Sequence, residues 1–203
     1  MPPNVLKIAG AQFLPKTPRS APRLTIVGKE ADNELFTPKA IIDWMPPIDL
    51  DVSWSPHCNV RPKYAMTIDD NALNLSWNHP DIHVIWMNPP YQNLRAWLAK
   101  AAAASMMAPY PMVICLVQAK PGERWFVDDV WPVMATVAFL KGRIVHDRPP
   151  WMGKSQAGTF NSCLPIFCED MERVKAVQRQ VADRARGHRN EPARWVWRER
   201  EEP

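Results

Sequence analysis

The hydrophobic and polar positions of the chain repeat with two periods, which divide it into strands and helices. Apolar runs of strand length occur at residues 82–87, 112–117, 136–140 and 162–167. Between the first two runs, residues 94–107 repeat apolar side chains at helical spacing. Strands that alternate with helices predict an α/β fold with a mostly parallel sheet. The last two strands have no helix between them and predict an antiparallel hairpin at the C-terminal end.

Two shorter elements are predicted before the first of these runs. Thr37 is placed to cap a short helix that begins at Pro38. Residues 48–52 alternate apolar and acidic side chains, which predicts a strand with Asp49 and Asp51 on the same side. Because carboxylates are costly to bury, we expect both to face a ligand or solvent at the sheet edge.

The two ends of the chain differ from its middle. Residues 1–30 carry scattered prolines and little periodicity, which predicts an irregular arm with one short strand at 24–27. From residue 169 the acids nearly balance the bases, so we expect residues 169–203 to form a solvated helix and a frayed tail. The catalytic domain is therefore predicted to span residues 31–168.

Composition limits the class of protein. At 203 residues, with 46% hydrophobic and 23% charged side chains, the chain suits one domain with its own core. No apolar run reaches the length of a membrane span, and the N-terminus resembles no signal peptide, so we expect a cytoplasmic protein without membrane contact. The net charge of +4 permits a polyanionic partner without requiring one.

Cysteine and histidine usage argues against disulfides and metals. The four cysteines lack paired C-x-x-C spacing, and they are Cys58, Cys115, Cys163 and Cys168. A disulfide framework is therefore not expected. His57, His79 and His146 stand alone in loops, so we predict no metal site.

The strongest candidate for chemistry is the point where the 82–87 run stops, at Asn88-Pro89-Pro90-Tyr91. Proline has no backbone donor, so a buried strand ends here and the two prolines stiffen the loop that follows. The carboxyl ends of parallel strands are the usual ligand site of an α/β sheet. An amide, a bare carbonyl and an aromatic ring in that place suit a flat base that carries an amino group. The alternative interpretation is a plain turn, because the chain contains 22 prolines.

Several stretches, taken in order, resemble the small phage-type DNA N6-adenine methyltransferases, which are Dam-like and carry this tetrapeptide. Besides the tetrapeptide, these stretches are Phe36-Thr37-Pro38, Asp49-Leu50-Asp51-Val52, Thr67 to Leu73 with Trp77, Trp125-Phe126, and Gly142-Arg143. The resemblance implies a Rossmann-like fold that uses S-adenosylmethionine as methyl donor and double-stranded DNA as substrate. It also implies a phage or prophage enzyme in the host cytoplasm that protects DNA from restriction.

The resemblance makes Asn88, Pro89, Pro90 and Tyr91 the catalytic residues. The Asn88 side-chain oxygen and the Pro89 carbonyl would accept hydrogen bonds from the exocyclic amine of adenine. Those bonds would draw the nitrogen lone pair out of conjugation, so that it can attack the sulfonium methyl. Tyr91 would stack on the base, which must first be flipped out of a duplex. Positioning and oriented acceptors would supply most of the rate.

For the methyl donor, the resemblance implies contacts from three segments. Asp49 or Asp51 would meet its ammonium or ribose groups, and Asp70 or Asn71 would accept from its adenine amine. The residues expected near its methionine end are Phe36, Thr37 and Pro38. Two points stay open: residues 69–71 also suit a plain turn, and the loop after Asp51 lacks the glycines of many methyltransferases.

No separate target-recognition domain is evident, so DNA contacts are expected from loops. The candidates are Lys120, Arg124, Trp125, Arg148 and Lys154. Such loops can also simply close a fold, and the sequence leaves a monomer and a homodimer equally open. Three other functions remain: methylation of adenine in RNA, methylation of protein glutamine, and non-catalytic nucleic-acid binding with the same fold.

Overall fold

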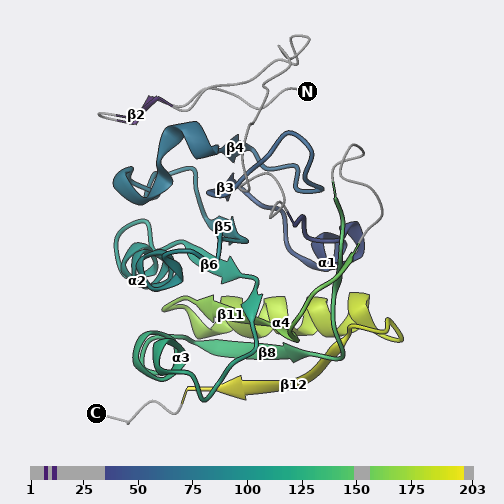
Figure 1. Cartoon of the computed structure of the whole chain (residues 1–203). Helices are drawn as coiled ribbons and strands as arrows, with labels where there is room; N and C mark the ends of the chain where they lie inside the picture. The colour runs from purple at the N-terminus through teal and green to yellow at the C-terminus, as the bar shows by residue number, and fades with distance from the viewer. Residues whose placement is uncertain (1–6, 9–10, 13–34, 149–155, 199–203) are drawn as a thin grey trace, which may run out of the picture.

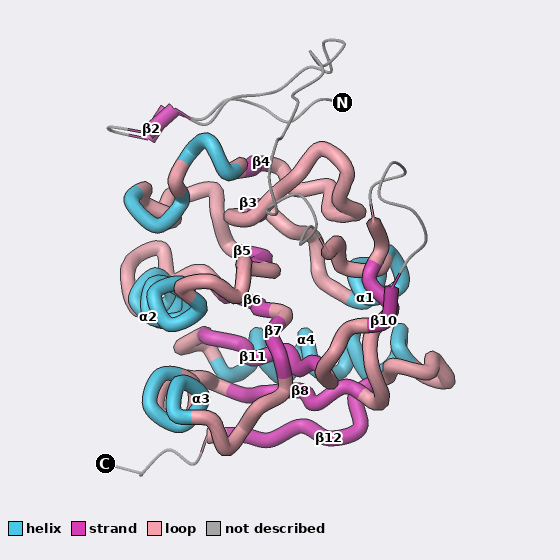
Figure 2. Tube along the Cα trace, in the orientation of Figure 1, coloured by secondary structure: helices cyan, strands magenta, loops and turns pink. Residues whose placement is uncertain are grey.

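A computed structural model of the chain describes residues 7–8, 11–12, 35–148 and 156–198. One large sheet forms the centre of the fold, and helices lie on both of its faces (Figure 1, Figure 2). None of the helices within these ranges is both long enough and apolar enough to cross a membrane.

The large sheet contains eight strands. Seven form one path, which in spatial order is β4 (Tyr64–Ala65), β3 (Leu50–Asp51), β5 (Val84–Met87), β6 (Met112–Cys115), β11 (Ser162–Phe167), β8 (Thr136–Leu140) and β12 (Pro192–Trp197). β7 (Val117–Gln118) follows β6 and pairs with β11.

The strand directions confirm the predicted fold class. β4, β3, β5 and β6 are parallel. β11 is antiparallel to both β6 and β8, so β8 runs in the same direction as β6. The sheet is therefore mostly parallel, and β8 with β11 forms the predicted antiparallel pair.

Two hydrophobic cores lie on opposite faces of the sheet. α2 (Leu94–Ser105) and α3 (Arg124–Asp129) pack on one core, and α1 (Lys39–Trp44) and α4 (Met171–Ala185) pack on the other. Successive residues of β5 alternate between the cores: Ile85 and Met87 join the first, and Trp86 joins the second. Because both faces are buried, the strand sequences are continuous apolar runs rather than alternating ones.

Two small pairs of antiparallel strands lie outside the large sheet. β1 (Lys7–Ile8) pairs with β2 (Ala11–Gln12), where the sequence predicted an irregular arm. β9 (Val145–His146) pairs with β10 (Gln156–Ala157) before β11. The predicted strand at 24–27 lies outside the described residues.

The predicted helix after residue 169 is present as α4, but it is not fully solvated, and the predicted frayed tail is wrong for residues 192–197. Asp170 caps α4, because its side chain accepts hydrogen bonds from the backbone of Glu172 and Arg173. One face of α4 is buried, and it consists of Val174, Val177, Val181 and Ala185. β12 then pairs with β8 as the edge strand. The prediction considered only the balance of charges and overlooked the apolar side chains that recur at helical spacing in this segment.

Candidate active site

The candidate site lies where β3 and β5 end, next to each other in the parallel part of the sheet. Asp51, the last residue of β3, pairs with the third residue of β5, and Asn88 follows directly after β5. In the loop that Asn88 opens, Pro89 is buried, whereas Pro90 and Tyr91 are exposed. The predicted ligand-binding edge therefore carries an anchored asparagine followed by an exposed turn.

The side-chain amide of Asn88 has a defined orientation. Its Nδ2 donates to the main-chain carbonyl of Leu35 at 3.1 Å, and its backbone N–H donates to Ser53 Oγ at 3.0 Å. A carbonyl oxygen can only accept, so the nitrogen of the amide must face Leu35. The Oδ1 oxygen then points away from Leu35, and within the described ranges no residue donates a hydrogen bond to it. Asn88 therefore offers one oriented acceptor at the sheet edge.

Asp51 is a buried carboxylate linked to Asn88 through one hydroxyl. Its side chain is almost fully buried, and its Oδ1 accepts from Ser53 N at 2.9 Å and from Ser53 Oγ at 3.2 Å. Burial raises the pKa of Asp51 to about 7, although the Ser53 hydrogen bonds oppose this. A cationic ligand beside it would restore the charged form, since an opposite charge lowers a carboxyl pKa.

Asp49 does not belong to this site. Its Oδ2 accepts from the backbone N–H groups of His83 and Val84, at 2.8 and 2.9 Å, where β5 begins. The carboxylate thus satisfies the start of the neighbouring strand, at the opposite end of the sheet from Asn88. The expectation that both acids face a ligand or solvent at one edge is not met, because Asp51 is almost fully buried and the Asp49 carboxylate bonds main chain at the start of β5. The alternating pattern of residues 48–52 places both side chains on one face of the strand, but it does not show at which end of the strand each one makes its contacts.

A short segment, Leu35–Thr37, contacts Asn88 through the Leu35 carbonyl, and we call it the strap. Phe36 exchanges two backbone hydrogen bonds with Asp147, at 2.9 and 3.0 Å. Asn59 Nδ2 donates to the Thr37 carbonyl and to Asp147 Oδ2, both at 2.8 Å. The predicted Phe-Thr-Pro segment is therefore brought against Asn88. The sequence predicted Thr37 as the N-cap of this helix. α1 begins at Lys39, so its N-cap is Pro38 instead.

The residues after β4 form a tight turn at the same edge. Asp70 Oδ2 accepts from Thr67 N at 2.6 Å and from Thr67 Oγ1 at 2.8 Å, as a capping box. Asn71 is exposed in a left-handed conformation with φ of 48°. Ile68 is 91% exposed beside them. The turn interpretation of residues 69–71 is correct for the backbone, and it leaves an apolar side chain free at the strand end.

Tyr91 spans from its loop to the neighbouring strand β7. Its ring is 43% exposed, and its side chain is hydrogen-bonded with that of Gln118. Burial raises the pKa of the Tyr91 phenol, while the Gln118 bond lowers it. Close to Gln118, the Lys120 ammonium lies 4.2 Å from the ring centroid of Phe160, which is 44% exposed. Sequence reasoning missed Gln118 and Phe160, because neither residue belongs to a local motif.

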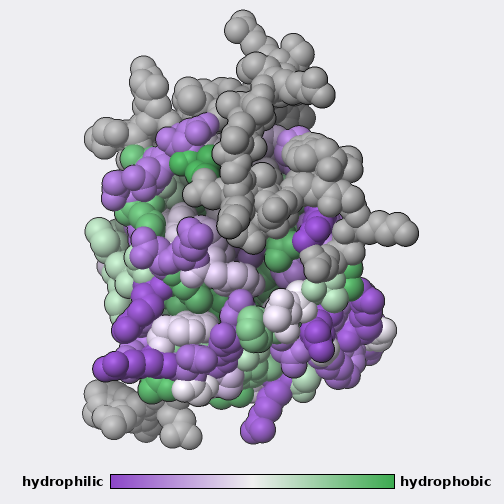
Figure 3. Space-filling model, in the orientation of Figure 1, coloured by the Kyte–Doolittle hydropathy of each residue, from purple (hydrophilic) through white to green (hydrophobic). Residues whose placement is uncertain are grey.

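The other predicted DNA contacts have mixed surroundings. Arg124 is highly exposed and lies 3.7 Å from Asp128, whereas Trp125 packs on Phe126 and against the core. Arg148 is partly buried, and Lys154 lies outside the described residues. On the face shown in Figure 3, the described hydrophilic side chains surround scattered hydrophobic ones, so the described residues present no broad apolar area there.

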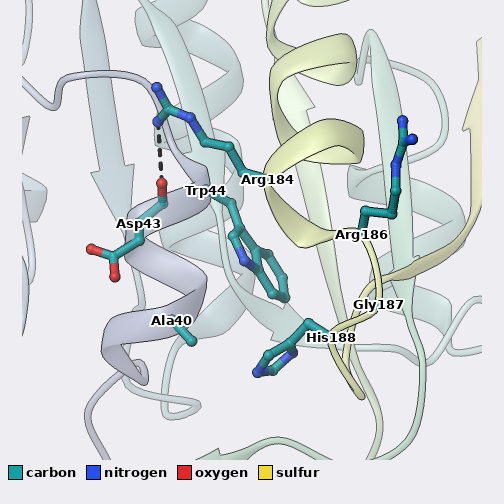
Figure 4. Close-up of a pocket in the computed structure, with 7 residues that line it drawn as sticks. All are labelled: Ala40, Asp43, Trp44, Arg184, Arg186, Gly187 and His188. Carbon is teal, nitrogen blue, oxygen red and sulfur yellow. Dashed lines mark hydrogen bonds between the residues drawn. The ribbon is translucent and has the colours of Figure 1, made fainter.

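A separate groove of about 540 Å³ lies between α1 and the end of α4 (Figure 4). It is lined by Ala40, Asp43, Trp44, Arg184, Arg186, Gly187 and His188. Arg184 donates to the main-chain carbonyls of Asp43 and Met45, so its guanidinium serves the end of α1. The groove shares no residue with the edge at Asn88. Across the described ranges, no three His, Cys, Asp or Glu side chains form a potential metal site.

Comparison with known proteins gives one match. A family model described as DNA N-6-adenine-methyltransferase (Dam) matches residues 29–185, well over half of the chain. The match includes the strap, both strand ends and α4. No curated protein and no solved structure matches the chain.

Proposed function

Because the chain belongs to the DNA N-6-adenine-methyltransferase (Dam) family, we propose that it transfers a methyl group from S-adenosylmethionine to the N6 amine of adenine in double-stranded DNA. The observation that carries this proposal is the oriented amide of Asn88. Its nitrogen is committed to the Leu35 carbonyl, and its oxygen remains available as an acceptor. An acceptor fixed in this way suits an amine whose lone pair must be exposed.

Asn88 and Pro89 would act on the amine together. The Asn88 Oδ1 and the Pro89 carbonyl each accept one N–H of the exocyclic amine, which favours a pyramidal nitrogen with its lone pair out of the ring. Bound S-adenosylmethionine would supply an electrophilic methyl on a sulfonium, whose carbon–sulfur electron pair returns to sulfur. The new carbon–nitrogen bond leaves the amine cationic, and it then releases one proton to water. No covalent link between enzyme and substrate is needed.

The residues present fit a cationic methyl donor. Asp51 is a buried acid whose pKa burial raises to about 7, and a positive group next to it would make its charged form favourable. We assign Asp51, rather than Asp49, to the ammonium or ribose of the donor. Phe36, Thr37 and Pro38 would line its methionine end, and Asp70 or Asn71 would accept from its adenine amine.

Tyr91 would hold the target base, and loops would hold the DNA. With 43% of its surface exposed and its side chain bonded to Gln118, the Tyr91 ring is a ready stacking platform. A base inside a duplex cannot reach Asn88, so the target adenine must flip out. Lys120 and Phe160 lie on the same corner and would contact the strand next to the flipped base.

Methyl transfer to duplex DNA tests the proposal. Purified full-length protein is incubated with unmethylated duplex DNA and S-adenosylmethionine that carries a tritiated methyl group. We expect label in DNA as N6-methyladenine, and Asn88→Ala should reduce the rate by about 10²–10³, as for loss of one oriented catalytic group. Label that enters only RNA or only protein would refute the proposal in favour of those substrates. Donor binding by calorimetry without transfer to any polymer would indicate a non-catalytic module.

A further inference from the structure

The orientation of the Asn88 amide depends on where the Leu35 carbonyl lies. An amide can turn over by rotation about its last side-chain bond, and nothing but its hydrogen-bond partners distinguishes the two orientations. The turned-over amide would present NH₂ to the substrate amine, which is also a donor, and the two would repel. The 3.1 Å bond from Nδ2 to Leu35 is therefore what makes Asn88 an acceptor.

The strap that carries Leu35 is held from two sides. Phe36 is bridged to Asp147 through the backbone, and Thr37 is almost fully buried. Asn59 uses both of its N–H groups here: one donates to the Thr37 carbonyl and one to Asp147 Oδ2, each at 2.8 Å. Asn59 thereby links the strap to Asp147 by side chain, in addition to the backbone bridge.

We propose that Asn59 is a positioning residue for Asn88, which acts by holding the strap so that the Leu35 carbonyl fixes the orientation of the Asn88 amide. The proposal rests on the proposed function, since it assigns a role within the same reaction. The contacts join positions 22, 88 and 53 residues apart: Asn59 with Thr37, Asn59 with Asp147, and Asn88 with Leu35. Asn59 reaches the substrate only through these intermediates.

The chain offers a matched control for Asn59. Asn78 Nδ2 also donates two hydrogen bonds of 2.8 Å, to the carbonyls of Ala104 and Met107 at the end of α2. Like Asn59, it is partly buried. Asn59→Ala and Asn78→Ala therefore each remove a side-chain amide that donates two hydrogen bonds. Asn59 holds the strap, whereas the partners of Asn78 at the end of α2 lie outside the site.

Two measurements test the proposal. The first is the rate of DNA methylation with both substrates saturating, where we expect Asn59→Ala to lower kcat about tenfold or more, as for misplacement of a reacting group. Asn78→Ala should leave kcat unchanged, while its melting temperature falls by about as much as that of Asn59→Ala. The second is the NMR signal of the Asn88 side-chain NH₂, assigned by its loss in Asn88→Ala. It should shift or broaden in Asn59→Ala and not in Asn78→Ala.

A second pair of variants covers the case in which Asn59→Ala does not fold. Asn59→Asp places a carboxylate against the Asp147 carboxylate, and adding Asp147→Asn restores a donor between the two positions but none for Thr37. We expect the double variant to recover part of the kcat lost by Asn59→Asp. An unchanged Asn88 NH₂ signal, or equal kcat losses in Asn59→Ala and Asn78→Ala, would overturn the proposal. Absence of any methyl transfer to DNA by the wild type would instead overturn the proposed function.

Discussion

The two halves of the sheet are built in different ways. β8 and β11 are regular strands of 5 and 6 residues, and apart from one partly exposed position their side chains are buried. β3 and β4 have only 2 residues each, and beyond them the chain is held by side chains that bond to main chain, such as Asn59 and Asn88. The antiparallel half is a scaffold stabilised by apolar burial, and the parallel half ends in a site fixed by individual polar contacts. Substitutions should therefore affect stability in one half and activity in the other.

The largest effect is expected in the scaffold. Phe167 of β11 is fully buried in the core under α2 and α3, and Phe167→Ala should lower the free energy of unfolding by about 3–5 kcal/mol. Urea denaturation measures this loss. The folded fraction should keep the specific activity of the wild type, and a loss of kcat beyond the loss of folded protein would contradict the division between the halves.

The next effect belongs to the site and should leave stability almost unchanged. Asn88→Asp puts a carboxylate against the Leu35 carbonyl, which needs a donor, so activity should fall about a hundredfold near pH 8. A protonated carboxyl can donate from its O–H, so the ratio of variant to wild-type activity should rise as pH falls toward about 5. A ratio that does not change with pH would show that the Leu35 carbonyl does not require a hydrogen-bond donor at position 88.

The scaffold was predictable from the sequence because its signal is local. Strands buried on both faces leave continuous apolar runs, and β8 and β11 have the predicted bounds, Thr136–Leu140 and Ser162–Phe167. The edge strand β12 was missed, because charges in an exposed strand resemble those of a solvated tail.

The site was predictable only where a functional residue belongs to a local sequence motif. Asn88 was found because two consecutive prolines follow it, which ends the strand at that point. No local motif identifies Ser53, Asn59 or Gln118, because their roles depend on partners that are distant along the chain. Asp49 and Asp51 looked equivalent in an alternating strand, and only their hydrogen bonds assign them to opposite ends of it.

A tenfold effect on donor binding should distinguish Asp51 from the surrounding polar network. Its folded pKa of about 7 lies above the ordinary value of 3.8, so the folded state holds a proton that the unfolded state releases. The free energy of unfolding of the ligand-free protein should therefore fall as pH rises from about 4 to about 7, and then level off. Asp51→Asn should remove this slope and weaken S-adenosylmethionine binding about tenfold, as measured by calorimetry. Asp49→Asn serves as the comparison for donor binding, because its carboxylate bonds only backbone at the far end of the strand.

The smallest effect is expected where the two halves of the sheet meet, at the corner that we propose contacts DNA. Phe160 is 44% exposed beneath the Lys120 ammonium, and Phe160→Ala should weaken binding of duplex DNA about five- to tenfold, through loss of one stacking contact. Phe160→Trp should keep the affinity, since any aromatic ring can stack. Met106→Ala removes a similarly exposed side chain, 49% exposed just after α2, and should leave DNA affinity unchanged in fluorescence anisotropy. Equal losses in the Phe160 and Met106 variants would place DNA elsewhere, because stacking needs the aromatic ring and general apolar contact does not.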